Sequence, residues 1–399
     1  MAPDRSDTAE VRTRRARVAV AALFLTNGVV FANLLPRYPE IKTDLGLSNS
    51  AYGAAIAAFS AGALAAGLTA ATLIRRYRSS RVAVLGTVGI GVFVLLAGVT
   101  ASPVLFAAAL FVAGACDAVT DVAQNAHGLR VQRIYGRSII NSLHAVWSAG
   151  AIIGGLMGAA AIALGISRAI HLGFSAVLCS VVVLVAYRFL LPGPDHDAEH
   201  RAGPAERGAA GVAVYATLLA LVAIAVAGAT VEDAGNTWAT LYLRDSLGAP
   251  APTAVTAYIA VVTSMFVGRL AGDRLVDRFG ERAVVRAGGA AMAVGMGLAL
   301  AFPSVPGTIA GFAVAGLGVA TLVPLAMHAA DQLPGLRPGS GLTILTWLMR
   351  IGFLGAPVLI GVVSDATSLR IGLLVVPAAG VAVVLLAGVL SARRPRARS

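Results

Sequence analysis

Twelve stretches of about 20 mainly apolar residues run through this 399-residue chain. A helix of that length crosses the hydrocarbon core of a bilayer. The chain is 58% hydrophobic and 13% charged, and because a soluble core stops growing at roughly 250–300 residues, this much apolar sequence needs lipid around it. We predict an all-α membrane protein with transmembrane helices at 18–36, 51–74, 82–100, 103–128, 138–164, 169–191, 211–233, 251–271, 283–302, 306–328, 340–362 and 371–391.

Basic residues are distributed unevenly between the two sides of the predicted membrane. Most of the 31 Lys and Arg residues lie in every second connecting segment, and the alternate segments hold only Arg37, Lys42, Arg168, Arg244 and Arg370. This positive-inside bias predicts that both termini are cytoplasmic, so the net charge of +12 indicates topology rather than a nucleic-acid partner. The preference for Arg over Lys is typical of a GC-rich bacterial genome. We therefore expect a multi-pass protein of a bacterial plasma (inner) membrane.

The sequence repeats across a segment rich in Pro, Gly and charge, PGPDHDAEHRAGPAERGAAG. In one ungapped register, LGLS at 45–48 matches LGAP at 247–250, and LIRRYRSSRVAVLG at 73–86 matches LVDRFGERAVVRAG at 275–288. A repeat of this size is typical of transporters in which two bundles move around a midplane site. We predict two pseudo-symmetric six-helix bundles, with a cytoplasmic tail at 1–17, the N-terminal bundle at 18–191, a cytoplasmic linker at 192–210, the C-terminal bundle at 211–391 and a second tail at 392–399.

Two acids lie inside the fourth predicted span, in DAVTDVAQNAHG at 117–128. Asp117, Asp121, Gln124 and Asn125 follow the spacing of one helical face. An ionised Asp at the centre of a lipid-facing helix costs about 2.5–3.5 kcal/mol, so acids at this depth indicate function. In a cavity that is wetted intermittently, such a carboxyl can bind and release a proton. We predict proton coupling by Asp121 and Asp117, the alternative being a buried polar network that holds helices together.

Other polar residues lie in spans five, seven and eleven. Arg350 is expected near the midplane, where a guanidinium needs an acid, carbonyls or an anionic ligand. Two interpretations stay open, namely substrate contact and an ion pair with Asp121, Asp117, Glu232 or Asp233. Asp233 and Asn236, expected at the outer end of span seven, are gate or substrate candidates. The full set of predicted substrate-binding residues is Asn125, Gln124, Asn141, His144, Ser148, Arg350, Trp347, Asp233 and Asn236.

Two motifs carry a family resemblance. GDRLVDRFGER at 272–282, between spans eight and nine, resembles the loop signature of the major facilitator superfamily, which implies a gating loop formed by Asp273, Arg274, Asp277, Arg278 and Gly280.

The second motif, TDVAQNAHG…NSLHAVWSAGAIIGGLMG in spans four and five, is similar to the fucose-proton symporter branch. That resemblance implies that Asp121 is the protonatable acid and Asn125 its companion. NLLPRYPEI after the first span also resembles the branch, with Ala32 and Asn33 standing where the branch has an acid.

These features together predict a secondary active transporter that moves a small polar solute, a sugar being one candidate, by proton-coupled alternating access. The alternatives are a proton-coupled exporter of drugs or metabolites and a non-transporting membrane sensor or scaffold. The sequence lacks a Walker motif, a Cys/His cluster and a nucleophile elbow, so we expect no enzyme, metal or cofactor. The expected partners are a small-molecule solute, protons and the lipid bilayer, without nucleic acid, and we expect a monomer.

Overall fold

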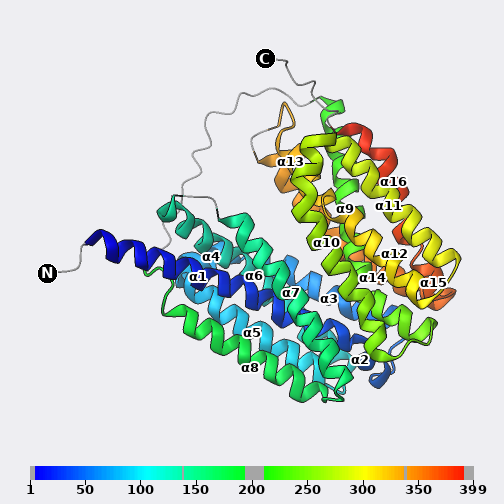
Figure 1. Ribbon diagram of the computed structural model, residues 1–399, viewed down its shortest axis with the longest axis horizontal. Coiled ribbons are helices and arrows are strands. Elements are labelled where there is room, and N and C mark those ends of the chain that lie inside the picture. Colours follow the sequence, from blue (N-terminus) through cyan, green and yellow to red (C-terminus); the bar gives the residue numbers. More distant parts are fainter. Residues whose placement is uncertain (1–4, 137–138, 194–210, 337–338, 391–399) are drawn as a thin grey trace. The chain divides into compact units, whose positions relative to one another are not determined.

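The structure is a computed structural model that describes residues 5–136, 139–193, 211–336 and 339–390. Figure 1 shows that these residues form helices joined by short connections. Twelve segments of this described part are helical, long enough and apolar enough to cross a membrane. The structure therefore confirms the predicted all-α class and the predicted number of spans.

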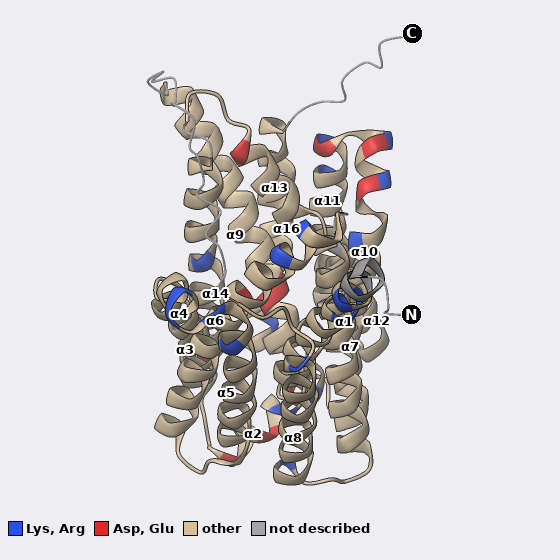
Figure 2. Cartoon of the chain, turned by 90° about the vertical axis from the view of Figure 1, so that its left-hand side faces the viewer, with Lys and Arg blue, Asp and Glu red and all other residues tan. Residues whose placement is uncertain are grey.

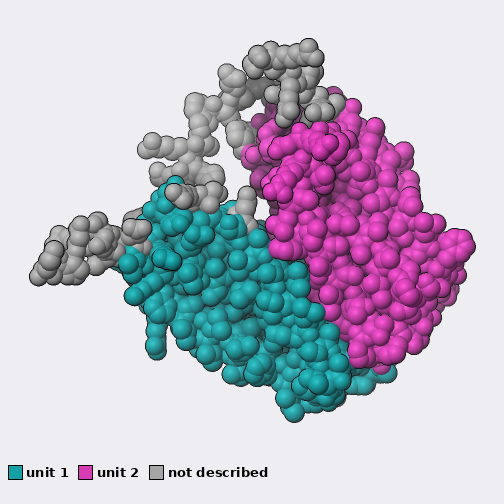
Figure 3. Space-filling model, in the orientation of Figure 1, with its two compact units in different colours: residues 1–47, 58–198 teal, residues 48–57, 199–399 magenta. Residues whose placement is uncertain are grey.

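The chain forms two compact units, coloured separately in Figure 3. Unit 1 comprises residues 1–47 and 58–198, and unit 2 comprises residues 48–57 and 199–399. Residues 48–57 pack within unit 2, where the Asp365 carboxylate accepts the backbone N–H groups of Asn49 and Ser50, each at 2.8 Å. Most of the predicted linker, at 194–210, and the predicted tail at 392–399 lie outside the described residues.

Unit 1 holds the first six spans. The first helix begins at Arg5, so the predicted cytoplasmic tail is helical from that residue onward. The second span is broken at 68–69 into two helices. The elements are α1 (Arg5–Ala32), η1 (Leu35–Arg37), α2 (Tyr38–Asp44), α3 (Asn49–Gly67, whose first residues pack in unit 2), α4 (Ala70–Tyr77), α5 (Ser79–Val99), α6 (Pro103–Tyr135), α7 (Ile140–Ala163) and α8 (Arg168–Tyr187).

Unit 2 holds the last six spans. Its first helix continues into a π-helical turn, so the seventh span is longer than predicted. The elements are α9 (Val212–Leu241), η2 (Tyr242–Ser246), α10 (Ala251–Phe279), α11 (Glu281–Ala301), α12 (Val305–Val319), α13 (Leu322–Asp331), α14 (Ser340–Ala366), α15 (Leu369–Gly372), α16 (Val375–Leu386) and η3 (Ala387–Val389).

The repeat seen in the sequence recurs in local backbone structure. Ser102 caps α6 by accepting the N–H of Leu105, and Ser304, its counterpart in the register, caps α12 by accepting the N–H of Gly307. A proline stands in the first turn of both helices, where its missing N–H has no cost. Matched positions in the two units therefore start matched helices by the same device.

Close approach of α1 and α7 organises the centre of unit 1. A Cβ added at Gly28 would lie 2.2 Å from the carbonyl oxygen of Trp147, and one added at Gly150 would lie 2.3 Å from that of Leu25. Only glycine fits at such distances, so these two helices pack backbone against backbone. This contact brings side chains of α1 within reach of side chains of α7.

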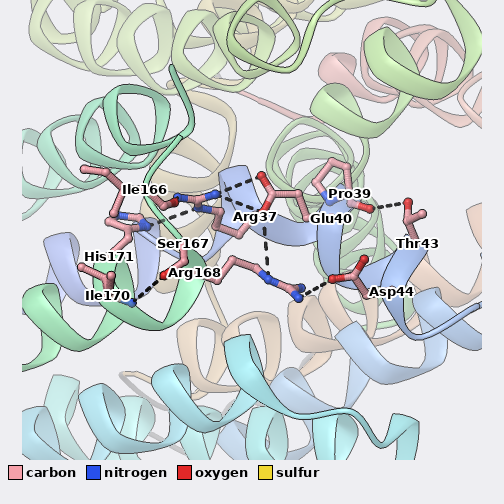
Figure 4. A network of polar contacts seen from close by, with 10 residues as sticks. All are labelled: Arg37, Pro39, Glu40, Thr43, Asp44, Ile166, Ser167, Arg168, Ile170 and His171. Carbon is pink, nitrogen blue, oxygen red and sulfur yellow. Dashed lines mark hydrogen bonds and ion pairs between the residues drawn. The ribbon is translucent and has the colours of Figure 1, made fainter. Parts of the chain in front are cut away.

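A polar network fixes the corner after α1 to the start of α8 (Figure 4). Arg37 is only 3% exposed and donates to both carboxylate oxygens of Glu40 at 3.0 Å. His171 lies against this guanidinium, and its Nε2 is 2.6 Å from Oδ1 of the fully buried Asn33. Asn33 thus belongs to a network that holds the corner in place. Other members drawn in Figure 4 are Asp44, Ile166 and Arg168.

Candidate functional site

The Asp121 carboxylate begins a chain of hydrogen bonds from α6 to α7 in unit 1. The side-chain amide of Asn125 donates to Oδ1 of Asp121 at 3.0 Å, and Nε2 of His144 lies 3.1 Å from Oδ1 of Asn125. Because the Asn125 oxygen can only accept, Nε2 of His144 must carry the hydrogen and donate. Asp121 and His144 are exposed within the unit, while Asn125 is half-buried. This chain joins three of the predicted residues into one group.

A second chain runs beside it through α1. The indole N–H of Trp147 donates to Oδ1 of Asn27 at 2.7 Å, and the amide of Asn27 donates to Oδ1 of Asp117 at 3.1 Å. The sequence analysis did not identify Asn27, although an Asn inside an apolar span is a signal of its own. The two chains start from acids four residues apart on α6 and end at rings three residues apart on α7. Each acid of α6 therefore has a separate set of partners.

Both acids lie at the middle of their span and away from its apolar surface. Asp117 and Asp121 flank the midpoint of the span Pro103–Tyr135, each within about 3 Å of it at a rise of 1.5 Å per residue. Phe111, Val122 and Leu129 form an exposed apolar stripe on the same helix. With 3.6 residues per turn, this stripe lies roughly a quarter-turn from Asp121. The carboxylates therefore occupy a different face from the side chains suited to lipid.

The other predicted residues of unit 1 are not joined to these chains in the same way. Gln124 is fully buried, and neither polar atom of its amide has a hydrogen-bond partner within the described residues. Gln124 therefore differs from Asp121 in burial, although both residues follow the spacing of one side of α6. The hydroxyl of Ser148 donates to the carbonyl oxygen of His144, in its own helix. The side chain of Asn141 lies outside the described residues.

The acids of α9 lie near the middle of the seventh span, which corrects their predicted place at its outer end. The helical span runs from Val212 to Ser246, because the polar residues after Asp233 continue the helix instead of ending it. Glu232 pairs with Arg269 of α10 at 3.8 Å. Asp233 is 8% exposed and accepts a hydrogen bond from Thr237 at 3.2 Å, and its Oδ2 has no partner among the residues that the structure describes.

The pair of Glu232 and Arg269 was not predicted, although Arg269 lies near the end of the predicted span 251–271. The tenth helix continues to Phe279, so Arg269 lies well inside a span. Asn236 follows Asp233 by three residues on the same face, and its Oδ1 is buried without a partner in the described part of the chain. Unit 2 thus carries ionisable groups at mid-span that differ in kind and in pairing from those of unit 1.

Arg350 and Trp347 lie one turn apart near the middle of α14, the span Ser340–Ala366. Trp347 is 53% exposed within unit 2. Arg350 is half-buried and has neither a hydrogen bond nor an ion pair to the described residues of unit 2. Of the acids considered as alternative partners of Arg350, Glu232 pairs with Arg269 and Asp233 accepts a hydrogen bond from Thr237.

The predicted gating loop is helical apart from one residue. Asp273, Arg274, Asp277 and Arg278 are exposed in the last turns of α10, and Gly280 alone connects this helix to α11. Gly280 has φ +82°, a conformation that favours glycine. Figure 2 shows acidic and basic residues gathered around this junction. The motif therefore forms a charged helix end and a one-residue turn.

The arrangement suits reversible binding of protons and polar solutes. Carboxyl groups, amides, an imidazole and an indole offer hydrogen bonds at mid-span in unit 1, and a guanidinium beside an indole does so in unit 2. Within the described residues, no three His, Cys, Asp or Glu side chains are placed to hold a metal ion. The chemistry available is therefore hydrogen bonding, charge pairing and proton exchange.

Comparison with known proteins agrees with this architecture. Residues 20–275 and 236–399 match the family model described as Major Facilitator Superfamily. The protein named "Uncharacterized transporter y4wD" of Sinorhizobium fredii is 29% identical over 376 residues, which cover 93% of this chain and 97% of the relative. The membrane protein MosC of Rhizobium meliloti is 28% identical over 368 residues, which cover 92% of this chain and 88% of the relative.

Solved structures share the fold at low sequence identity. A mutant form of the nucleoside transporter NupG aligns with a TM-score of 0.76 and 12% identity, over 94% of this chain and 99% of that structure. The D-xylose-proton symporter aligns with a TM-score of 0.69 and 15% identity, over 94% of this chain and 95% of that structure. With family matches that extend over most of its length, this chain belongs to the Major Facilitator Superfamily and is a secondary transporter, not an enzyme.

Proposed function

We propose that the chain moves a small polar solute together with protons by alternating access, with Asp121 as the proton carrier. The observation that carries this proposal is the exposed mid-span carboxylate of Asp121, hydrogen-bonded through Asn125 to His144. Water can reach an exposed carboxylate, and closure of the cavity around it would favour the neutral acid. A group whose proton affinity depends on which side is open can carry a proton across the membrane.

Asp117 has a supporting role in this scheme. Its carboxylate receives the amide of Asn27, which is held in turn by Trp147. This chain orients Asp117 beside the face of Asp121, one helical turn away on α6. A second acid at this distance makes simultaneous ionisation of both carboxylates unfavourable, so Asp117 tunes the proton affinity of Asp121.

The solute contacts proposed for unit 2 begin with Arg350 and Trp347. An exposed indole can stack on a flat or apolar face of a solute, and the guanidinium of Arg350 can donate up to five hydrogen bonds. The named cargoes of two structures with this fold, a nucleoside and D-xylose, are small and polar, which supports the same solute class here. The similarity of spans four and five to the fucose-proton symporter branch supports a sugar. The remaining predicted contacts, Asn125, Gln124, Asn141, His144, Ser148, Asp233 and Asn236, stay predictions.

The membrane setting follows from the charge pattern and the relatives. The bias of Lys and Arg toward alternate connecting segments supports cytoplasmic termini, and the relatives are bacterial, so the proposed location is the bacterial plasma membrane. All twelve candidate spans belong to the one chain, which supports a monomer as the transporting species.

Replacement of Asp121 by Asn tests the carrier. Purified protein is first screened by thermal shift against pentoses, hexoses, nucleosides and sugar acids at two pH values, and a radiolabelled form of the stabilising solute is then used in proteoliposomes. Asp121→Asn should lose accumulation driven by a proton gradient, because an amide cannot bind and release the proton. Exchange of solute at equal concentrations without a gradient should remain, since that step needs no net proton transfer.

Asp245→Asn is the matched control, because Asp245 is an exposed acid on η2 at the end of the seventh span, beside Arg244. This variant should accumulate solute as the wild-type chain does. Accumulation by Asp121→Asn at the wild-type level would show that the proton travels on another group.

A further inference from the structure

One end of unit 1 contains a cavity of about 850 Å³ whose polar lining is strongly basic. Arg12 and Arg15 reach it from α1, Arg78 from the junction of α4 and α5, and Arg188 from the end of α8. Among the described residues that line it, none is acidic. Four arginines from three separate parts of the sequence therefore line one space.

These four arginines have no hydrogen-bond or ion-pair partner among the residues that the structure describes. No described residue forms a hydrogen bond or an ion pair with any of them, whereas Arg17 donates to Tyr135 and Arg81 to Tyr187. Guanidinium groups that lie together repel each other unless an anion compensates them. Arg17 and Arg81 thus have partners within the fold, whereas the four arginines that line the cavity contact no described polar partner.

The wall of the cavity is held in place by buried contacts. Segment 188–193 carries the apolar lining residues Phe189, Leu190 and Leu191. The backbone N–H of Leu191 donates to Nε2 of the fully buried His127 at 3.2 Å, and Arg130 donates to the carbonyl oxygens of Pro192 and Gly193. Because these contacts fix the segment from behind, the cavity exists without a ligand and needs little ordering when one binds.

The backbone conformation of Arg78 is a second, independent observation that favours a functional role for this residue. Arg78 has φ +75° and ψ +145°, and Gly280, its counterpart in the repeat, has φ +82° and ψ +157°. Glycine adopts this conformation without strain, and other residues rarely do. Among the described residues, Arg78 is the only one other than glycine with a positive φ. Unit 1 thus accepts backbone strain at a position where the side chain lines the cavity.

The cavity lies where helices leave the membrane. Arg12 and Arg15 belong to the start of the first span, Arg78 stands between the second and third, and Arg188 follows the last helical residue of the sixth. All these points lie on the same side of the membrane, because an even number of crossings separates them. Apolar residues line the cavity beside the charges, including Val11 and Phe189, which are themselves exposed.

We propose that this cavity binds the phosphate headgroup of an anionic phospholipid, with the arginines around the phosphodiester and the acyl chains along the apolar wall. The combination of basic and apolar lining residues favours a lipid over a free anion, because inorganic phosphate has no apolar part to pack against Phe189, Leu190 and Leu191. Basic pockets at the edge of transmembrane helices bind anionic headgroups for the same reason. Zwitterionic lipid fits less well, because its ammonium group would meet the arginines.

Native mass spectrometry of the full chain in detergent tests the proposal directly. Dioleoylphosphatidylglycerol or dioleoylphosphatidylcholine is titrated in, and bound lipid is counted for the wild-type chain and for Arg15→Gln/Arg188→Gln. Each basic residue near a headgroup adds about 1 kcal/mol, so the double variant should bind phosphatidylglycerol roughly 30-fold more weakly. Binding of phosphatidylcholine should be weak in both proteins.

Arg133→Gln provides the matched control, because Arg133 is exposed on α6 at the same end of unit 1 and does not line the cavity. It should bind phosphatidylglycerol like the wild type. Equal binding by the double variant and the wild type would overturn the proposal. A thermal shift with inorganic phosphate as large as that with phosphatidylglycerol would also overturn it, in favour of a free-anion site.

Discussion

The mid-span polar groups of the two units differ in how they are satisfied. In unit 1, Asp121 and Asp117 each receive a hydrogen bond from an amide that is itself held by a ring on α7. Among the described residues of unit 2, the buried Asp233 has a single hydroxyl partner and one unpartnered oxygen, and Arg350 has no hydrogen bond or ion pair. The acids of unit 1 are oriented by neighbours, whereas those groups of unit 2 retain unused bonding capacity.

This contrast exists although the units share their backbone plan. Ser102 and Ser304 start matched helices, and Arg78 and Gly280 form matched turns with nearly the same φ and ψ. Helix starts and turns depend on backbone geometry, so a repeat preserves them easily. A polar side chain at mid-span contacts only the side chains next to it. The two units can therefore share a backbone plan and still carry different polar residues with different hydrogen-bond partners. This contrast supports the proposal that proton handling belongs mainly to unit 1 and that Arg350 and Trp347 of unit 2 contact the solute.

The largest effect is expected for Arg350, since its guanidinium has no hydrogen bond or ion pair to the described residues of unit 2. If the guanidinium contacts the solute, Arg350→Gln should weaken binding of the solute found by the thermal-shift screen by about 10- to 100-fold, the cost of one charge-assisted hydrogen bond. Arg350→Lys should bind with intermediate affinity, because it keeps the charge and loses the planar fork. Isothermal titration calorimetry measures both affinities.

Unchanged affinity in Arg350→Gln together with a lower melting temperature would assign Arg350 to structure. The proposed contact between Arg350 of unit 2 and the solute would then be wrong.

A smaller effect is expected from the two tryptophans. Trp147 of unit 1 donates a hydrogen bond to Asn27, whereas the indole of Trp347 in unit 2 is exposed. Trp147→Phe removes the donor to Asn27 and keeps most of the ring, so it should lower the free energy of unfolding by about 0.5–1.5 kcal/mol. Trp347→Phe, at an exposed indole, should change it by less than about 0.5 kcal/mol. Thermal unfolding in detergent compares the two variants, and equal losses would mean that the chain through Asn27 does not orient the acid.

The smallest effect is expected at Asp233. An ionised carboxylate buried with one hydroxyl and no cation is costly, and the neutral acid avoids that cost. Asp233→Asn replaces a neutral carboxyl by a neutral amide of the same shape, so the free energy of unfolding should shift by no more than about 0.5 kcal/mol. Thermal unfolding at neutral pH measures it. Strong stabilisation by this substitution would show that a buried charge had been removed.

The sequence by itself determined that this protein lies in a lipid bilayer, how many spans it has and that its two halves repeat. Hydropathy over about 20 residues is a local property, and the need to satisfy every backbone group in lipid leaves only helices for such stretches. It also identified Asp117 and Asp121 as acids in an apolar setting, because an ionisable residue at that depth is conspicuous without any knowledge of its neighbours.

Only the tertiary structure decided which groups meet. Asn27 reaches Asp117 and Trp147 because glycines let α1 and α7 approach closely, and no spacing rule relates residues so far apart in the chain. Packing also buried Gln124 on a face predicted to be shared, and it joined Glu232 to Arg269 across two helices. The end of α9 was misjudged because polar residues that normally stop a span can continue as helix once protein, rather than lipid, surrounds them.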